Sequence, residues 1–336
     1  MSQASLKKAA LLAVTAAVAA GLAGAKEAGY SVVDKFGGPD GGYDYISVDS
    51  AKQRVFVGRS DGVMTIDLAT LKVTPVFVKA DDVAAVLIIT GTDLMLSTNG
   101  GSNNATLFDR NTGKVKAVIP TGEEPDGALY DERTGLAFVM NGGSEDVTLI
   151  DIKKAAPVAT IPVHGTPEAA AVDGKGRLYV NIEDKAEVAV IDIASRKVVA
   201  NHKLPGCEEP TGLAFDSVSG ELISACHNGT AKLIDAKSGS DKGSVAIGEG
   251  ADGALFDAQR RLAYVSCMDG TLSIFPLGND GKAGAVTRVK TAVGARTQAL
   301  DPKTGRVYLP RADYKAAADG KRTRVPGTFE VLVVSP

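Results

Sequence analysis

Short runs of apolar residues, separated by turn-forming residues, recur along most of the chain. In residues 168–205, runs of apolar and β-branched residues alternate with clusters of Gly, Asp, Asn and Ser. Runs of this kind are typical of β-strands joined by tight turns. The 3.6-residue apolar period that would indicate helices is missing. The pattern predicts four short strands in this segment and an all-β fold.

This pattern repeats about every 42 residues. An apolar residue followed by Asp recurs at intervals of 41 to 43 residues, in Ile66-Asp67, Phe108-Asp109, Ile150-Asp151, Ile191-Asp192 and Ile234-Asp235. A second marker before each Gly-rich turn recurs at intervals of 40 to 44 residues, in Asp49, Gly91, Asp131, Asp173, Asp216, Asp257 and Asp301. Four strands per unit and this period are typical of propeller blades. The sequence therefore predicts a seven-bladed β-propeller with four-stranded blades.

The seventh unit lacks its outermost strand. Residues 297–301, 306–310 and 329–334 provide three strands before the chain ends. Residues 30–37 match the outer strand of an earlier unit, residues 197–204. We therefore predict that this N-terminal strand completes the last blade, which closes the ring and removes exposed strand edges.

The first 25 residues have the layout of an export signal. Lys7 and Lys8 precede an apolar run over residues 9–20 and a small-residue triplet ending at Ala25. A membrane-spanning helix needs about 20 apolar residues, so a cleaved signal is favoured over an uncleaved N-terminal anchor. The sequence predicts cleavage after Ala25, a periplasmic or secreted protein, and a single domain over residues 26–336.

Charge argues against nucleic acid as a partner. Without the two lysines of the predicted signal, 35 basic and 40 acidic side chains remain, with no long block of one sign. Such a surface does not attract polyanions. No other long apolar run indicates a membrane, and we expect a monomer.

Two tetrapeptides within the repeats point to a family. Leu178-Tyr179-Val180-Asn181 and Phe138-Val139-Met140-Asn141 are each followed by a strand that ends in Ile-Asp. These units resemble those of the YVTN-repeat, YncE-like family of bacterial seven-bladed propellers, over essentially the whole mature chain. The resemblance implies export, a propeller, and often an association with cofactor or metal metabolism. It does not indicate a reaction, because the residues that define the family build blades.

Aligning the innermost strands predicts a cluster of charged residues at one mouth of the axial channel. The residues five positions before the second marker are Asp44, Val86, Asp126, Glu168, Thr211, Asp252 and Arg296. Converging carboxylates raise one another's pKa or recruit a cation. We therefore predict a site for a divalent metal ion such as calcium or magnesium, or for a cationic or polyhydroxylated ligand held partly by Arg296. Tyr43 and Tyr45 are expected to help line it. The alternative is that these acidic residues only cap turns and face water.

A second set of residues lies in equivalent loops of adjacent blades. Cys226 and His227 in the fifth unit correspond to Cys267 and Met268 in the sixth. Thiolate, thioether and imidazole ligands suit copper or zinc. With Cys207, however, the cysteines equally allow one disulfide among the three or unpaired packing, and the spacing matches no recognised metal motif.

The longest insertion, residues 311–327, is rich in basic residues, including Arg311. A long loop on a rigid scaffold is a common place for recognition, so we expect it to contact an anionic partner or to fold over the channel. The alternative is a solvated loop.

Three function classes follow. The favoured hypothesis is a binding or scaffolding propeller that takes an unknown small molecule or protein at the channel mouth. No nucleophile elbow or Ser, His and Asp set is brought together by the repeat, which argues against an enzyme. The alternatives are a metal-assisted, lactonase-like hydrolase that uses the channel carboxylates, and copper or zinc handling through the cysteine-bearing loops.

Overall fold

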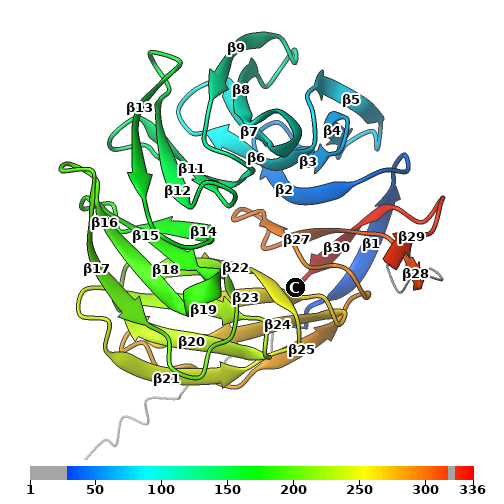
Figure 1. Cartoon of the computed structure of the whole chain (residues 1–336). Helices are drawn as coiled ribbons and strands as arrows, with labels where there is room; N and C mark the ends of the chain where they lie inside the picture. The colour runs from blue at the N-terminus through cyan, green and yellow to red at the C-terminus, as the bar shows by residue number, and fades with distance from the viewer. Residues whose placement is uncertain (1–28, 317–321) are drawn as a thin grey trace, which may run out of the picture.

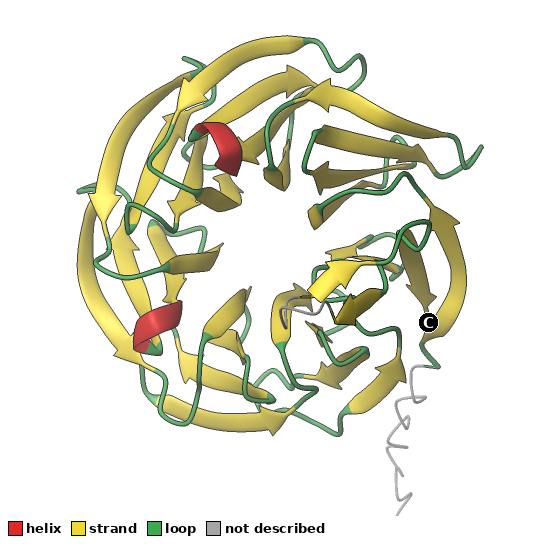
Figure 2. Cartoon of the chain, turned by 45° about the vertical axis from the view of Figure 1, so that its right-hand side comes forward, coloured by secondary structure: helices red, strands yellow, loops and turns green. Residues whose placement is uncertain are grey.

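The computed structural model describes residues 29–316 and 322–336, so the predicted export signal lies outside the described residues. The chain forms seven four-stranded antiparallel sheets arranged in a ring (Figure 1; Figure 2). This confirms the predicted seven-bladed β-propeller. None of the helices in the described part of the chain is long and apolar enough to cross a membrane.

Six blades consist of consecutive strands, with the first strand innermost and the fourth at the rim. Blade one contains β2 (Tyr43–Asp49), β3 (Arg54–Arg59), β4 (Gly62–Asp67) and β5 (Val73–Lys79). Blade two contains β6 (Val83–Ile89), β7 (Leu94–Asn99), β8 (Asn104–Asp109) and β9 (Val115–Pro120). Blade three contains β10 (Pro125–Asp131), β11 (Leu136–Asn141), β12 (Asp146–Asp151) and β13 (Ala156–Pro162). Blade four contains β14 (Pro167–Val172), β15 (Arg177–Ile182), β16 (Glu187–Asp192) and β17 (Lys197–Lys203). Blade five contains β18 (Pro210–Asp216), β19 (Glu221–Cys226), β20 (Thr230–Asp235) and β21 (Asp241–Ala246). Blade six contains β22 (Ala251–Asp257), β23 (Leu262–Cys267), β24 (Thr271–Pro276) and β25 (Thr287–Lys290). Two short 3-10 helices, η1 (Gly100–Ser102) and η2 (Glu183–Lys185), lie in loops.

The aspartates that mark the repeat hold its turns. Asp49 Oδ1 accepts hydrogen bonds from the backbone N–H groups of Ala51 and Lys52, at 3.2 and 3.0 Å. Asp67 Oδ1 does the same for the turn after the third strand, with Thr70 N at 2.8 Å. Equivalent contacts recur at Asp109, Asp131, Asp151, Asp173, Asp192, Asp216, Asp235, Asp257 and Asp301. Asp is favoured at these positions because its side chain replaces a backbone acceptor in a tight turn.

The N-terminal strand completes blade seven, as predicted. That blade contains β26 (Ala299–Leu300), β27 (Val307–Arg311), β30 (Glu330–Ser335) and β1 (Ser31–Gly37). Strand β1 pairs antiparallel with β30, and in Figure 1 the blue N-terminal strand lies beside the red C-terminal one. Just before β1, Tyr30 Oη lies 2.7 Å from Tyr264 Oη in blade six. The first and last strands of the described chain therefore pair in one sheet, which closes the ring.

The hydrophobic core lies between neighbouring blades. Second and third strands are buried along nearly their whole length, because each faces a blade on either side. One cluster joins Val55 and Met64 of blade one to Tyr308 and Val331 of blade seven. Packing across this junction supports the closure made by strand β1.

The insertion in blade seven forms a small hairpin. Strands β28 (Tyr314–Ala316) and β29 (Arg322–Arg324) pair antiparallel, with Tyr314 opposite Arg324. This hairpin carries side chains to the channel mouth, as described below.

Candidate functional site

The innermost strands of blades one to six are irregular near their starts. In blade three the pairing with the second strand shifts between Pro125 and Ala128, and equivalent shifts occur in the other five blades. Such bulges re-aim side chains and are common beside functional sites. In each blade one pair precedes the shift. The residues that directly follow this first pair along the innermost strand are Asp44, Ala84, Asp126, Glu168, Thr211 and Asp252.

Blade two differs from the sequence alignment. We expected Val86 in this column, but Ala84 occupies it, and Val86 belongs to the core. The marker residue explains the difference. In blade two the position equivalent to Asp131 of blade three is Ile89, because each pairs with the start of the second strand. Gly91 lies two residues further on, so counting back from it gave a position two residues too late.

The channel mouth is a cavity of about 700 Å³, which we call the mouth cavity. Its acidic lining residues are Asp44, Asp82, Glu124, Asp126 and Glu168. Arg296 and Arg324 also line it. Side chains from blades one, two, three, four and seven thus meet in one space.

Arg296 is the main counter-charge. Its Nη1 lies 2.6 Å from Asp252 Oδ2, and its Nη2 lies 3.6 Å from Asp44 Oδ1. Burial raises the pKa of Asp44 to about 6, although the arginine opposes that rise. Burial opposes the charged form of Arg296, but the same two carboxylates raise its pKa above the usual value, so the guanidinium stays charged. One guanidinium is shared between two acids.

Asp126 and Glu168 lie in the same cavity, in blades three and four. Burial, with the neighbouring acids, raises the pKa of Asp126 to about 8 and that of Glu168 to about 9. The Oδ1 atom of Asp126 is buried and has no hydrogen-bond partner within the described residues. Both side chains are therefore neutral at pH 7 and would ionise if a cation entered the cavity.

Sequence reasoning missed three acidic residues of this region, Glu124, which lines the mouth cavity, and Glu183 and Asp82. Glu183, in helix η2, hydrogen bonds to Glu168, and burial raises the pKa of Glu183. Asp82 lines the mouth cavity and raises the pKa of Asp44. All three stand in loops rather than in the aligned column of the innermost strands. Asp82 precedes the first strand of blade two and Glu183 follows the second strand of blade four, so the two positions are not equivalent in the repeat and its spacing did not reveal them.

Tyr45 and several glycines lie further along the channel. They line a smaller cavity of about 220 Å³, together with Asp252. Burial holds the pKa of Tyr45 well above its usual value. A Cβ atom on Gly212 would come within 2.3 Å of Ala254 N, so glycine is needed there for the close approach of two innermost strands.

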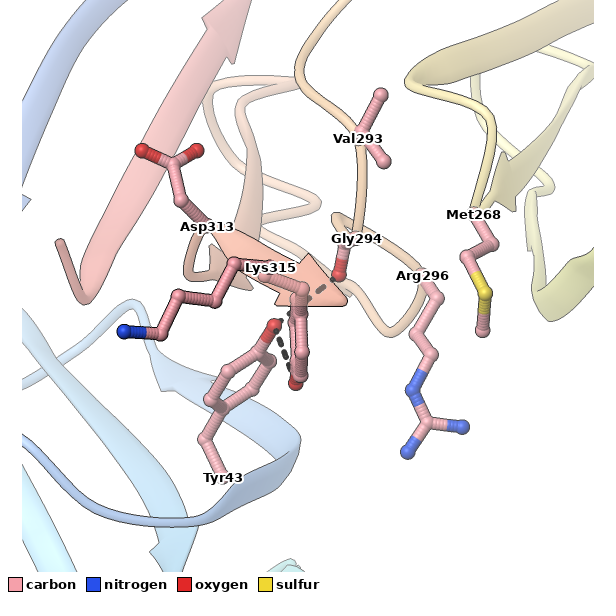
Figure 3. Close-up of a pocket in the computed structure, with 8 residues that line it drawn as sticks. Tyr43, Met268, Val293, Gly294, Arg296, Asp313 and Lys315 are labelled. Atoms are coloured by element: carbon pink, nitrogen blue, oxygen red, sulfur yellow. Dashed lines mark hydrogen bonds between the residues drawn. The ribbon is translucent and has the colours of Figure 1, made fainter. Parts of the chain in front are cut away.

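A second cavity, of about 510 Å³, adjoins the mouth (Figure 3). We call it the side cavity; it is lined by Tyr43, Met268, Val293, Gly294, Arg296, Asp313, Tyr314 and Lys315. Tyr43 and Arg296 line both cavities. Figure 3 shows Met268 and Arg296 across from Tyr43.

Arg324, rather than Arg311, brings the charge of the insertion to this region. Its guanidinium carbon lies 5.4 Å from the ring centre of Tyr43 and 5.8 Å from that of Tyr314. Arg311 was predicted to bind a ligand, but it lines neither cavity and pairs with Glu330 and Asp313 at the base of the hairpin. Those ion pairs neutralise it.

The structure does not assemble the predicted copper or zinc ligands. Cys226 forms a disulfide with Cys207, so its sulfur is not available as a thiolate. Cys267 is a buried free thiol, and burial raises its pKa to about 12. His227 is exposed, with Nδ1 3.6 Å from Glu209, and Met268 lies in the side cavity. Within residues 29–316 and 322–336, no group of three or more His, Cys, Asp or Glu side chains is placed to hold a metal ion.

Comparison with solved structures supports the fold. The chain is similar to "Kuenenia stuttgartiensis Hydrazine Synthase", with a TM-score of 0.68 and 17% sequence identity. The match covers 86% of this chain and 97% of the other. No protein-family model and no curated protein matches by sequence. At this identity the likeness shows the propeller fold alone.

Proposed function

We propose that this chain is an exported, YncE-like propeller that binds an organic cation in the mouth cavity. The observation that carries the proposal is two neighbouring buried carboxyl groups, Asp126 and Glu168, which form no ion pair with Arg296, Arg324 or any other cation among the described residues. A cation placed between them would lower their pKa values and supply the counter-charge that lets them ionise. It would also satisfy the buried Oδ1 atom of Asp126.

Size supports an organic ligand. A cavity of about 700 Å³ falls in the range of small-molecule sites, which is about 300–1,000 Å³. The walls come from rigid strand starts in several blades, so the site is largely preformed. Preformed sites bind without the entropy loss of ordering loops.

Export is supported by two features. The N-terminal residues follow the layout of a signal peptide. The disulfide between Cys207 and Cys226 suits an oxidising compartment such as the periplasm. A periplasmic solute-capture role agrees with both.

Isothermal titration calorimetry would test the proposal. Purified protein is titrated at pH 8 with methylammonium, guanidinium, Ca²⁺ and Mg²⁺, and the paired variant Asp126→Asn with Glu168→Gln is compared with wild type. We expect an organic cation to bind wild type and to bind the paired variant at least tenfold more weakly. The control pair, Asp34→Asn with Glu132→Gln, changes exposed acids outside the cavity and should bind like wild type.

Other outcomes would redirect the assignment. Binding of Ca²⁺ or Mg²⁺ alone, lost in the paired variant, would favour a metal site and reopen the hydrolase alternative. Equal affinity of wild type and the paired variant for every cation would refute the proposal.

A further inference from the structure

The side cavity has apolar walls that face solvent. Val293 and Tyr314 are 61% and 38% exposed, although both are large hydrophobic residues. Both line the side cavity, together with Met268. Exposed apolar side chains that gather around a hollow, rather than being scattered, are typical of a binding surface.

The wall between the two cavities is fixed in place. Tyr43 Oη accepts a hydrogen bond from Ala312 N at 3.0 Å and lies 3.4 Å from both Gly294 O and Tyr314 Oη (Figure 3). The Tyr43 ring packs against Phe329, with ring centres 5.3 Å apart. A side chain held by this many contacts does not swing away, so the side cavity exists before any ligand arrives.

The two cavities differ in chemistry and share a border. Acidic groups dominate the mouth cavity, whereas apolar and aromatic groups provide much of the side cavity. Arg296 and Arg324 lie at the border. Asp252 and Asp44 balance the charge of Arg296. Arg324 packs over the rings of Tyr43 and Tyr314. A ligand that fills both spaces therefore needs a cationic end and an apolar end.

We infer that the ligand is an amphipathic organic cation. Its ammonium or guanidinium group lies against Asp126 and Glu168, and its aliphatic or aromatic part lies against Met268, Val293 and Tyr314. This inference rests on the proposed function, which places the cation in the mouth cavity. It adds the class of molecule: an amine or guanidine with an apolar substituent.

The test is a series of n-alkylammonium ions from methyl to hexyl, titrated calorimetrically at pH 8. Each methylene that enters the side cavity should raise affinity by about two- to fourfold. Val293→Ser should lower the affinity for hexylammonium at least threefold more than that for methylammonium. The matched control is Val199→Ser, because Val199 is 52% exposed on outer strand β17; it should leave the series unchanged.

Failure of this inference can be told apart from failure of the proposed function. If all chain lengths bind equally and the Asp126→Asn, Glu168→Gln pair weakens them all, the mouth binds cations and the side cavity plays no part. If no alkylammonium ion binds but guanidinium does, this inference fails alone. If neither binds, or if the paired variant binds them all as wild type does, the proposed function fails and this inference with it. A chain-length trend that Val293→Ser leaves unaltered would also overturn the inference.

Discussion

Arg296 Nη1 lies 2.6 Å from Asp252 Oδ2, and this ion pair joins blades six and seven. The same guanidinium reaches Asp44 in blade one at 3.6 Å. The Arg296 side chain therefore links blades one, six and seven, and it forms ion pairs with Asp44 and Asp252. Asp44 and Asp252 share it, and Asp126 and Glu168 form no ion pair with it.

The first prediction concerns that ion pair. Arg296→Met should lower the free energy of unfolding by about 1–3 kcal/mol, because it leaves a partly buried carboxylate unpaired. Asp252→Asn should also destabilise the protein. The double variant should lose less than the sum of the two, with a coupling of about 1–2 kcal/mol. Urea unfolding of the four proteins at pH 7 measures the cycle.

An exposed pair provides the control. Lys282 and Asp280 lie 3.6 Å apart with side chains 86% and 62% exposed. The cycle Lys282→Met with Asp280→Asn should give a coupling below about 0.5 kcal/mol. Strict additivity of the Arg296 and Asp252 effects would show that this ion pair does not stabilise the junction of blades six and seven.

The second prediction is a loss of stability as pH rises. In the unfolded chain Asp and Glu titrate near pH 4, whereas burial raises the pKa of Asp126 to about 8 and that of Glu168 to about 9. Between these pKa values the native state holds two protons that the unfolded state has released. The free energy of unfolding contributed by these groups therefore falls as the pH rises from about 4 to about 9. We expect a lower free energy of unfolding at pH 9 than at pH 5.

Paired variants isolate the contribution of these two groups. Asp126→Asn with Glu168→Gln cannot ionise and should show a smaller loss between pH 5 and pH 9, measured by urea unfolding. The exposed pair Asp34→Asn with Glu132→Gln should behave like wild type. An equal loss in wild type and in the mouth variant would mean that these carboxyls are not held neutral in the native state.

The architecture could be predicted because its markers act locally. Asp49 and Asp67 each accept backbone hydrogen bonds within their own turns, so the spacing of such residues reports the blade length directly. The same spacing placed Asp44, Asp126, Glu168 and Asp252 in one column. The spacing gave the wrong residue in blade two. There Gly91 lies two residues beyond the end of the innermost strand, so Ala84 rather than Val86 occupies the column.

Features outside the repeat could not be predicted. Arg324 reaches the mouth through a hairpin that occurs in one blade, so no other unit gives its position. The pairing of Cys207 with Cys226 depends on how the loop before β18 approaches the end of strand β19, with Cα atoms 5.3 Å apart. Three cysteines in a sequence leave every pairing open.

The third prediction concerns the disulfide. Cys207 and Cys226 are 19 residues apart, and closing a loop of this size stabilises a protein by about 3 kcal/mol. Replacing both by Ala should lower the free energy of unfolding by about 2–4 kcal/mol. Wild type unfolded and refolded with dithiothreitol should lose a similar amount. Cys267→Ala keeps the disulfide and should remain sensitive to dithiothreitol; an insensitive wild type would contradict the pairing.

The fourth prediction is that cation binding releases protons. At pH 7 Asp126 and Glu168 are neutral, with pKa values of about 8 and 9. A cation between them lowers both pKa values, so binding an alkylammonium ion at pH 7 should release about one proton or more. Calorimetry in buffers with different ionisation enthalpies measures that number. At pH 10 both groups are already ionised and the release should vanish; binding at pH 7 without proton release would place the cation elsewhere.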